Sequence, residues 1–122
     1  MSEGIGVIVY SPMASGLLTG AMTRERAAKL PADDWRGRNP DFTEPNLSQN
    51  LALVERLRAV ANRHNRAVGE VAISWTLGNP AVTGAIVGAR NAQQAEGVMR
   101  AGEFHLTDDD VNEIEAFAEA AA

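Results

Sequence analysis

Two short stretches of the chain are apolar without interruption, and both have the composition of β-strands. The first, GIGVIVY, covers residues 4–10, and the second, TGAIVG, covers residues 83–88. A continuous apolar run predicts a strand buried on both faces, as in a parallel sheet, whereas a strand with one wet face alternates apolar and polar positions. Pro12 ends the first strand, because proline cannot extend the hydrogen-bonded ladder.

Helical spacing of apolar residues predicts the other regular elements. Apolar residues recur every three or four positions from 47 to 61, which predicts an amphipathic helix ending near residue 65. Asn46 or Ser48 could cap the start of this helix. The remaining predicted helices cover 23–30, 69–77, 92–101 and a final segment that follows Thr107.

The segment from 31 to 45 differs in character from the helices around it. It is rich in proline, glycine and aspartate, and it still carries two large aromatic residues, Trp35 and Phe42. A long loop inside a compact domain is more often a lid or a binding loop than a linker. We therefore expect this loop to border a ligand site.

Strands and helices alternate along the chain, which predicts an α/β fold built from parallel βα units with right-handed crossovers. We expect two parallel strands and about four to five helices. Two strands alone leave open edges and uncovered apolar faces. The pattern therefore requires partners for the sheet. One interpretation is a chain that binds another protein, or a second copy of itself, through its exposed strand edges.

Composition narrows the class of protein. The chain has 122 residues, a hydrophobic fraction of 45% and a net charge of -5, which suits one soluble globular domain and disfavours binding to nucleic acid or to an anionic membrane. No apolar run is long enough to span a bilayer, and we expect no secretory signal. Cysteine is absent, which excludes disulfides and thiolate sites and fits a cytoplasmic protein. The aspartate runs lack the spacing of a calcium loop, so we expect no metal site.

The loop after the first strand, residues 11–20, is one candidate site. Ligands of α/β proteins collect at the carboxyl ends of strands. Ser11 offers a hydroxyl, and the small residues that follow let backbone N–H groups approach an anion. An ordinary strand-to-helix turn would have the same composition.

The loop after the second strand is the other candidate site. Gly88 and Ala89 allow close approach of a ligand, and Arg90 precedes a predicted helix N-terminus. Orphan N–H groups and the helix dipole attract phosphate there, and arginine can bind phosphate through two hydrogen bonds. A surface arginine at a helix start is the alternative interpretation.

The two loops together resemble the aldo/keto reductase family. "GIGVIVYSPMASGLLTG" is similar to the seventh barrel strand and its loop, and "EVAISWTLGNPAVTGAIVGARNAQQAEGV" is similar to the helix before strand eight, that strand and the adenosine loop. The resemblance implies a partial (β/α)8 TIM barrel, with residues 1–122 as the C-terminal fragment of an NADP-dependent oxidoreductase domain that reduces carbonyls to alcohols.

The resemblance also implies roles for individual residues toward NADP(H). Tyr10 would stack on the nicotinamide. The stretch that contains Trp35, Arg36 and Phe42 would lie in the loop that borders the pocket of a small carbonyl substrate. The nicotinamide ribose and pyrophosphate would be lined by Ser11, Met13, Gly16 and Leu17. The adenosine and its 2'-phosphate would be surrounded by Gly88, Ala89, Arg90, Gln94 and Glu96, with Arg90 as the phosphate contact.

The sequence departs from the family pattern at both ends of this site. Some relatives have Lys-Ser where Gly88 and Ala89 stand, and many have asparagine where Gly97 and Val98 stand. The family's catalytic aspartate, tyrosine, lysine and histidine come from the first four strands, and no matching segment is present. We therefore expect no catalytic residue and no carbonyl reductase activity in the isolated chain. A non-catalytic chain with weak nucleotide affinity is the alternative.

Three further residues have structural interpretations. The two histidines, His64 and His105, are expected to be solvated surface residues. Trp75 is expected in the core.

Overall fold

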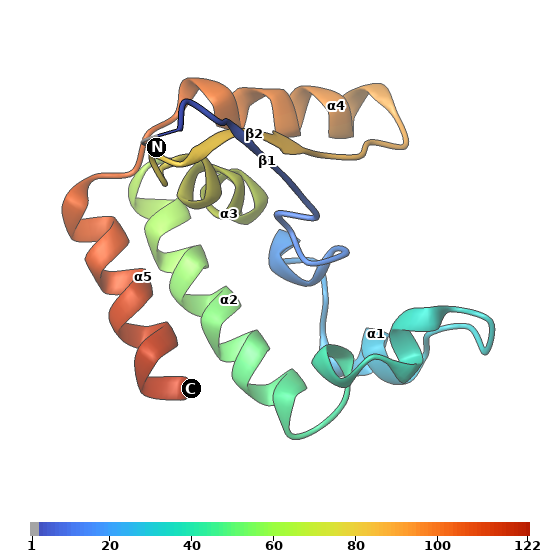
Figure 1. Ribbon diagram of the computed structural model, residues 1–122. Coiled ribbons are helices and arrows are strands. Elements are labelled where there is room, and N and C mark those ends of the chain that lie inside the picture. The colour runs from blue at the N-terminus through green and yellow to red at the C-terminus, as the bar shows by residue number, and fades with distance from the viewer. Residues whose placement is uncertain (1–2) are drawn as a thin grey trace.

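The computed structural model describes residues 3–122, and its sheet consists of two parallel strands (Figure 1). Strand β1 comprises Val7–Tyr10 and strand β2 comprises Val82–Ile86, with Tyr10 opposite Ile86 at their carboxyl ends. Parallel strands need a long crossover, and the chain between them supplies it as three helices. The parallel pairing confirms the α/β fold class, although both strands are shorter than their apolar runs.

Five α-helices lie within the described residues, as the apolar spacing predicts. Helix α2 begins at Asn46 without a side-chain cap from Asn46 or Ser48, which corrects that prediction. The carboxylate of Glu44 instead accepts the N–H of Ser48 at 3.2 Å. The helices are α1 Arg24–Ala28, α2 Asn46–Arg63, α3 Val68–Leu77, α4 Ala92–Met99 and α5 Asp108–Ala121, and short 3-10 helices cover Leu17–Thr19, Trp35–Arg38, Pro40–Phe42 and Arg100–Glu103.

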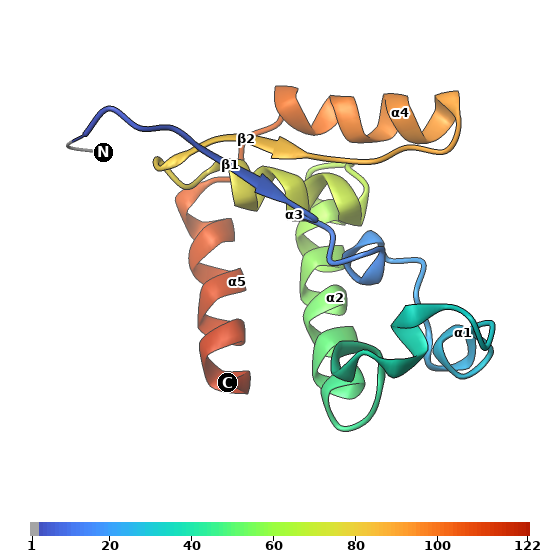
Figure 2. The ribbon, with the colours of Figure 1, turned by 45° about the vertical axis from the view of Figure 1, so that its right-hand side comes forward.

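The main hydrophobic core lies where α2, α3 and α5 meet. Figure 2 shows α2 and α5 side by side, with α3 across their upper ends. Val60 of α2 and Val71 of α3 are fully buried at this junction. The core comprises Val54, Leu57, Val60, Ala61, Val68, Val71, Ala72, Phe104 and Ile114.

A second, smaller core anchors the loops. It comprises Leu17, Met22, Phe42 and Leu47, and it lies where the 3-10 helices Leu17–Thr19 and Pro40–Phe42 contact α2. Phe42 is buried in this cluster rather than exposed on the loop. The cluster therefore fixes the loop 31–45 to the loop after β1 and to the start of α2.

The sheet is much more exposed than the apolar runs predict. The side chains of Ile8, Tyr10 and Ile86 are 67%, 82% and 60% exposed, so the prediction of strands buried on both faces is wrong for this chain. Helix α3 packs against β2, but within residues 3–122 β1 has only β2 as a strand neighbour. The residues have the composition of buried strands because such strands are normally covered by neighbours.

Two further predictions about single residues need correction. Trp75 is 43% exposed near the end of α3, outside the main core. His105 is exposed as expected, but His64 is partly buried and its Nε2 lies 2.7 Å from a carboxylate oxygen of Asp110. The two residues are 46 positions apart, so no local pattern reveals the contact.

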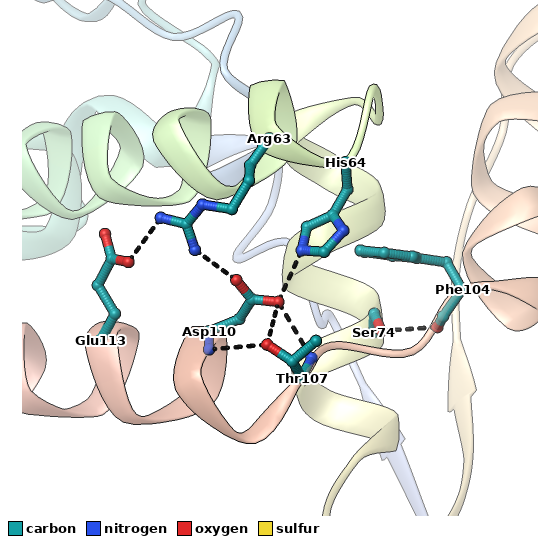
Figure 3. Close-up of polar contacts among 7 residues, drawn as sticks. All are labelled: Arg63, His64, Ser74, Phe104, Thr107, Asp110 and Glu113. Carbon is teal, nitrogen blue, oxygen red and sulfur yellow. Dashed lines mark hydrogen bonds and ion pairs between the residues drawn. The ribbon is translucent and has the colours of Figure 1, made fainter.

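Asp110 is the centre of a polar network that joins α2 to α5 (Figure 3). Its carboxylate also accepts the N–H and the hydroxyl of Thr107 at 3.0 and 2.8 Å, and Arg63 donates to it at 2.6 Å. Burial alone would raise the pKa of Asp110, but the hydrogen bonds from Thr107 and His64 outweigh burial and lower it. The network therefore favours an ionised Asp110 that caps α5 and holds it against α2.

None of the helices in residues 3–122 combines the length and the apolar character that crossing a bilayer requires.

Candidate functional site

The carboxyl ends of β1 and β2 open into one cavity of about 1310 Å³. Typical pockets for small ligands measure roughly 300–1,000 Å³, so this cavity has room for an extended ligand. Most of the residues that the sequence predicts at a cofactor site line it together. These are Tyr10, Ser11, Met13, Gly16, Gly88, Ala89, Arg90 and Gln94.

The loop after β1 has an unusual backbone. Ser11, Ala14 and Ser15 have φ values of 51°, 49° and 57°, in the left-handed region that non-glycine residues rarely adopt. Gly16 follows with a φ of 93°. Residues held in such conformations gather at ligand sites, and successive right- and left-handed residues form concave nests of N–H groups that bind anions.

Several hydrogen-bond donors of this loop belong to residues that line the cavity and are uncommitted. Within residues 3–122, no hydrogen bond engages the hydroxyls of Ser11 and Ser15 or the N–H groups of Met13 and Ser15. Helix α3 packs closely against the loop, because a Cβ placed on Gly69 would come within 3.1 Å of the Met13 sulfur. The loop therefore packs against α3 and keeps free donors, which suits an anionic or hydroxylated ligand.

Arg90 marks the other end of the cavity, at the start of α4. Its own N–H donates to the side-chain oxygen of Gln94 at 2.8 Å, and the side chain of Asn91 caps the helix by accepting the N–H of Gln94 at 2.9 Å. Among the described residues the guanidinium of Arg90 has no ion-pair partner. A fixed backbone thus presents a free cation at a helix N-terminus, which is a favourable place for phosphate.

A third segment of the wall comes from the 3-10 helix Trp35–Arg38. The carboxylate of Asp34 accepts from Arg36 through Nε at 3.0 Å and Nη2 at 2.6 Å, and it also accepts the Arg36 N–H at 3.0 Å. The side-chain hydrogen bonds from Arg36 lower the pKa of Asp34 to about 2. Sequence reasoning missed this pair as a feature of the site. The signal in the sequence is the order Asp-Trp-Arg, in which Trp35 separates two residues of opposite charge.

Three of the predicted site residues lie away from the cavity. Leu17 points into the small core, and so does Phe42, whereas Glu96 is exposed on α4. Trp35 does line the cavity and is the aromatic residue of the loop that a ligand could reach. Gly97 and Val98 also line it, so the wall there carries no side-chain amide.

The titratable side chains on the cavity wall are Tyr10, Asp33, Asp34 and Glu70, together with arginines. Its wall in the described part of the chain includes neither a histidine nor a lysine, and Lys29 is exposed and paired with Glu25 at 2.6 Å. Glu70 reaches the wall, but its carboxylate is committed to the Ala67 N–H at 2.8 Å and to Arg66 at 3.2 Å. No group of three or more acidic or histidine side chains within residues 3–122 is arranged to hold a metal ion.

The fold and this cavity define part of an α/β barrel that gathers its ligand site at the carboxyl ends of its strands. The chain belongs to the aldo/keto reductase family, because the model of the Aldo/keto reductase family matches residues 1–119.

Curated and solved relatives agree with this assignment. The chain is 31% identical over 116 residues to "Aldo-keto reductase YhdN" of Bacillus subtilis (strain 168), which covers 94% of this chain and 34% of that protein. It is 28% identical over 112 residues to "Aldo-keto reductase yakc [NADP(+)]" of Schizosaccharomyces pombe (strain 972 / ATCC 24843), covering 92% of this chain and 32% of that protein.

The fold also matches that of the solved glycerol dehydrogenase AKR11B4 from Gluconobacter oxydans with a TM-score of 0.88, at 29% identity, over 99% of this chain and 36% of that one. The chain thus spans about a third of the relatives that it matches.

Proposed function

We propose that this chain forms the NADP(H)-binding part of an aldo/keto reductase that reduces small carbonyl compounds to alcohols when the barrel is complete. The observation that carries the proposal is the single cavity, which unites the loop after β1 with the loop after β2. NADP(H) fits the donors on its wall, and a relative in the same family carries NADP(+) in its name.

Each end of the cavity suits a different part of the cofactor. Arg90 and the N-terminus of α4 would bind the 2'-phosphate, and the nest of the loop after β1 would bind the pyrophosphate. Tyr10 presents an exposed ring at the carboxyl end of β1, where it would stack on the nicotinamide. The bound cofactor supplies a hydride for the carbonyl carbon, and Trp35 would border the substrate.

We infer that the proton donor for this reaction comes from the rest of the complete barrel. Reduction of a carbonyl needs an acid within hydrogen-bond reach of the carbonyl oxygen, and the cavity wall offers no histidine or lysine in residues 3–122. We therefore expect the isolated chain to bind cofactor without reducing carbonyls. The cytoplasmic location expected from the sequence stays a prediction.

Cofactor titration tests the proposal. Trp75→Phe removes the fluorophore outside the cavity, so the remaining tryptophan signal comes from Trp35 at the cavity wall. NADPH should quench this signal at lower concentration than NADH, and Arg90→Ala should remove most of the difference. Loss of a hydrogen bond to a charged group costs about 1.5–3 kcal/mol, or about ten- to a hundredfold in affinity.

Arg38→Ala is the matched control, because Arg38 is an exposed arginine of the same region that does not line the cavity. The control should keep the preference for NADPH. Equal affinity of the unchanged chain for both cofactors would overturn the proposal.

The exposed sheet favours a second candidate function, association through the open strand edges. Ile8 and Ile86 are exposed on strands that contain no charged residue to discourage edge pairing. A second copy of the chain could extend the sheet. Light scattering tests this candidate: a defined oligomer at micromolar concentration supports it, and a monomer at every concentration excludes it.

A further inference from the structure

Asp34 and Arg36 form a tight ion pair on the wall of the cofactor cavity. Their side chains are 17% and 24% exposed, and three side-chain hydrogen bonds of 2.6 to 3.2 Å join them. Ion pairs at a protein surface usually leave both groups well solvated. This pair is half-enclosed and faces the same space as Arg90.

Arg36 also ties its loop to the loop after β1. Its Nη1 lies 3.4 Å from the carbonyl oxygen of Ser15, and its guanidinium stands over the Phe42 ring at 5.9 Å from the ring centre. Phe42 belongs to the small buried core. Arg36 is therefore held from several sides, and through it Asp34 is held at the cavity.

The other charged side chains on the cavity wall are either paired or exposed to solvent. Glu70 is neutralised by Arg66 and Arg100, and Arg26 donates to the carbonyl of Ala21 at 2.8 Å. Asp33 is exposed to solvent, where screening weakens its charge. Asp34 is thus a well-enclosed carboxylate, held by Arg36, that lines the same cavity as Arg90.

We propose that Arg36 is a positioning residue for the 2'-phosphate of NADP(H), and that it acts by neutralising Asp34 beside the phosphate site at Arg90. The inference rests on the proposed function. A dianionic phosphate at Arg90 has to share the cavity with the Asp34 carboxylate, which repels it. The bidentate contact from Arg36 cancels that repulsion and keeps the carboxylate turned toward its own loop.

A double-mutant cycle on the complete chain tests the proposal, with NADPH and NADH as probes and Trp35 fluorescence as the readout. Arg36→Gln leaves the Asp34 charge uncompensated, so the preference for NADPH over NADH should fall by about two- to fivefold, the range of a partly exposed charge interaction. Adding Asp34→Asn to Arg36→Gln removes the repulsion and should restore the preference. Arg36→Lys, which keeps the positive charge, should retain it in larger part.

A purely structural role of Arg36 predicts a different pattern. Loss of the Ser15 contact would weaken NADPH and NADH equally, and the double variant would bind as poorly as Arg36→Gln. That pattern would overturn the inference. Asp34→Asn alone guards against a loop that fails to fold without Arg36, because it should strengthen NADPH binding relative to NADH. Asp41→Asn changes an exposed aspartate of the same loop that does not line the cavity, and it should leave the ratio unchanged.

The outcomes also separate this inference from the function on which it rests. An unchanged chain that binds NADPH and NADH equally overturns both. An unchanged chain that prefers NADPH, together with an Arg36→Gln variant that prefers it to the same degree, overturns the inference alone.

Discussion

The helical part of the molecule buries its apolar side chains, whereas the sheet leaves several of its apolar side chains exposed. Helices α2, α3 and α5 bury their apolar faces against one another, and the polar groups between them are paired through Asp110. Strands β1 and β2 have equally apolar sequences but leave Ile8, Tyr10 and Ile86 exposed. The difference shows that the helices of this chain carry their own packing partners, whereas the strands have the composition of a sheet with further neighbours.

The largest expected effect separates the two regions by stability. Leu57 is 3% exposed in the main core, so Leu57→Ala should destabilise the chain by about 2–5 kcal/mol. Ile8→Ala on the open strand is the matched control and should cost about 0.5 kcal/mol or less, the usual effect of a surface change. Urea denaturation followed by circular dichroism measures both. Similar losses for the two variants would contradict the comparison.

The polar junction between α2 and α5 should show a smaller effect. Asp110→Ala removes the acceptor for Thr107, His64 and Arg63 and should destabilise the chain by about 1–3 kcal/mol, as expected when buried donors lose their partner. Glu113→Ala removes only the more exposed contact to Arg63 and should cost less than about 1 kcal/mol. If Glu113→Ala costs as much as Asp110→Ala, the role assigned to the buried carboxylate is wrong.

The same junction makes the free energy of unfolding depend on pH in the acid range. The pKa of Asp110 is lower in the folded chain than its ordinary value of 3.8, so its contribution is complete above that value and declines as the pH falls below it. Chemical denaturation between pH 6 and about pH 2 should show this loss. Asp110→Asn cannot ionise and should flatten part of the decline; an identical pH profile for both chains would show that Asp110 does not contribute.

A charge on the open strand should change association more than stability. Ile8→Lys places a cation on an exposed strand position, where it discourages edge pairing at a stability cost of about 0.5 kcal/mol or less. If the unchanged chain forms an oligomer through its edges, this variant should be smaller by light scattering. Asn112→Lys is the control, because it adds the same charge on the exposed face of α5 and leaves the Thr107 cap of that helix intact.

The sequence was informative where a residue's partners lie nearby in the chain. Helical spacing predicts α2 and α5, and Thr107 with its three aspartates marks the start of α5. The burial of the strands could not be predicted, because it depends on neighbours that the apolar pattern implies but does not supply. Local pattern predicts an exposed His64 and a buried Trp75, and the structure shows a partly buried His64 and an exposed Trp75. Packing between helices that are distant in the sequence sets these surroundings.

The candidate site divides in the same way. Composition and resemblance predict a site at the two loops after the strands, and the structure places eight of the predicted residues, six of them in those loops, around one cavity. The positions of Leu17 and Phe42 follow from a small core that joins three separate segments, which no local pattern shows. The role of the Asp34–Arg36 pair could not be predicted from the sequence, because Arg36 contacts Ser15 and the pair shares a cavity with Arg90, and both of these residues are distant in the chain.

Backbone amide shifts on titration with NADP(H) test the central claim most directly, because they report where on the chain the cofactor binds. The account predicts shifts in both loops, in residues 11–16 and 88–94, with the shifts of the second loop lost in Arg90→Ala. Shifts confined to the exposed strands and the adjoining helix surfaces, or no shifts at millimolar cofactor, would contradict it.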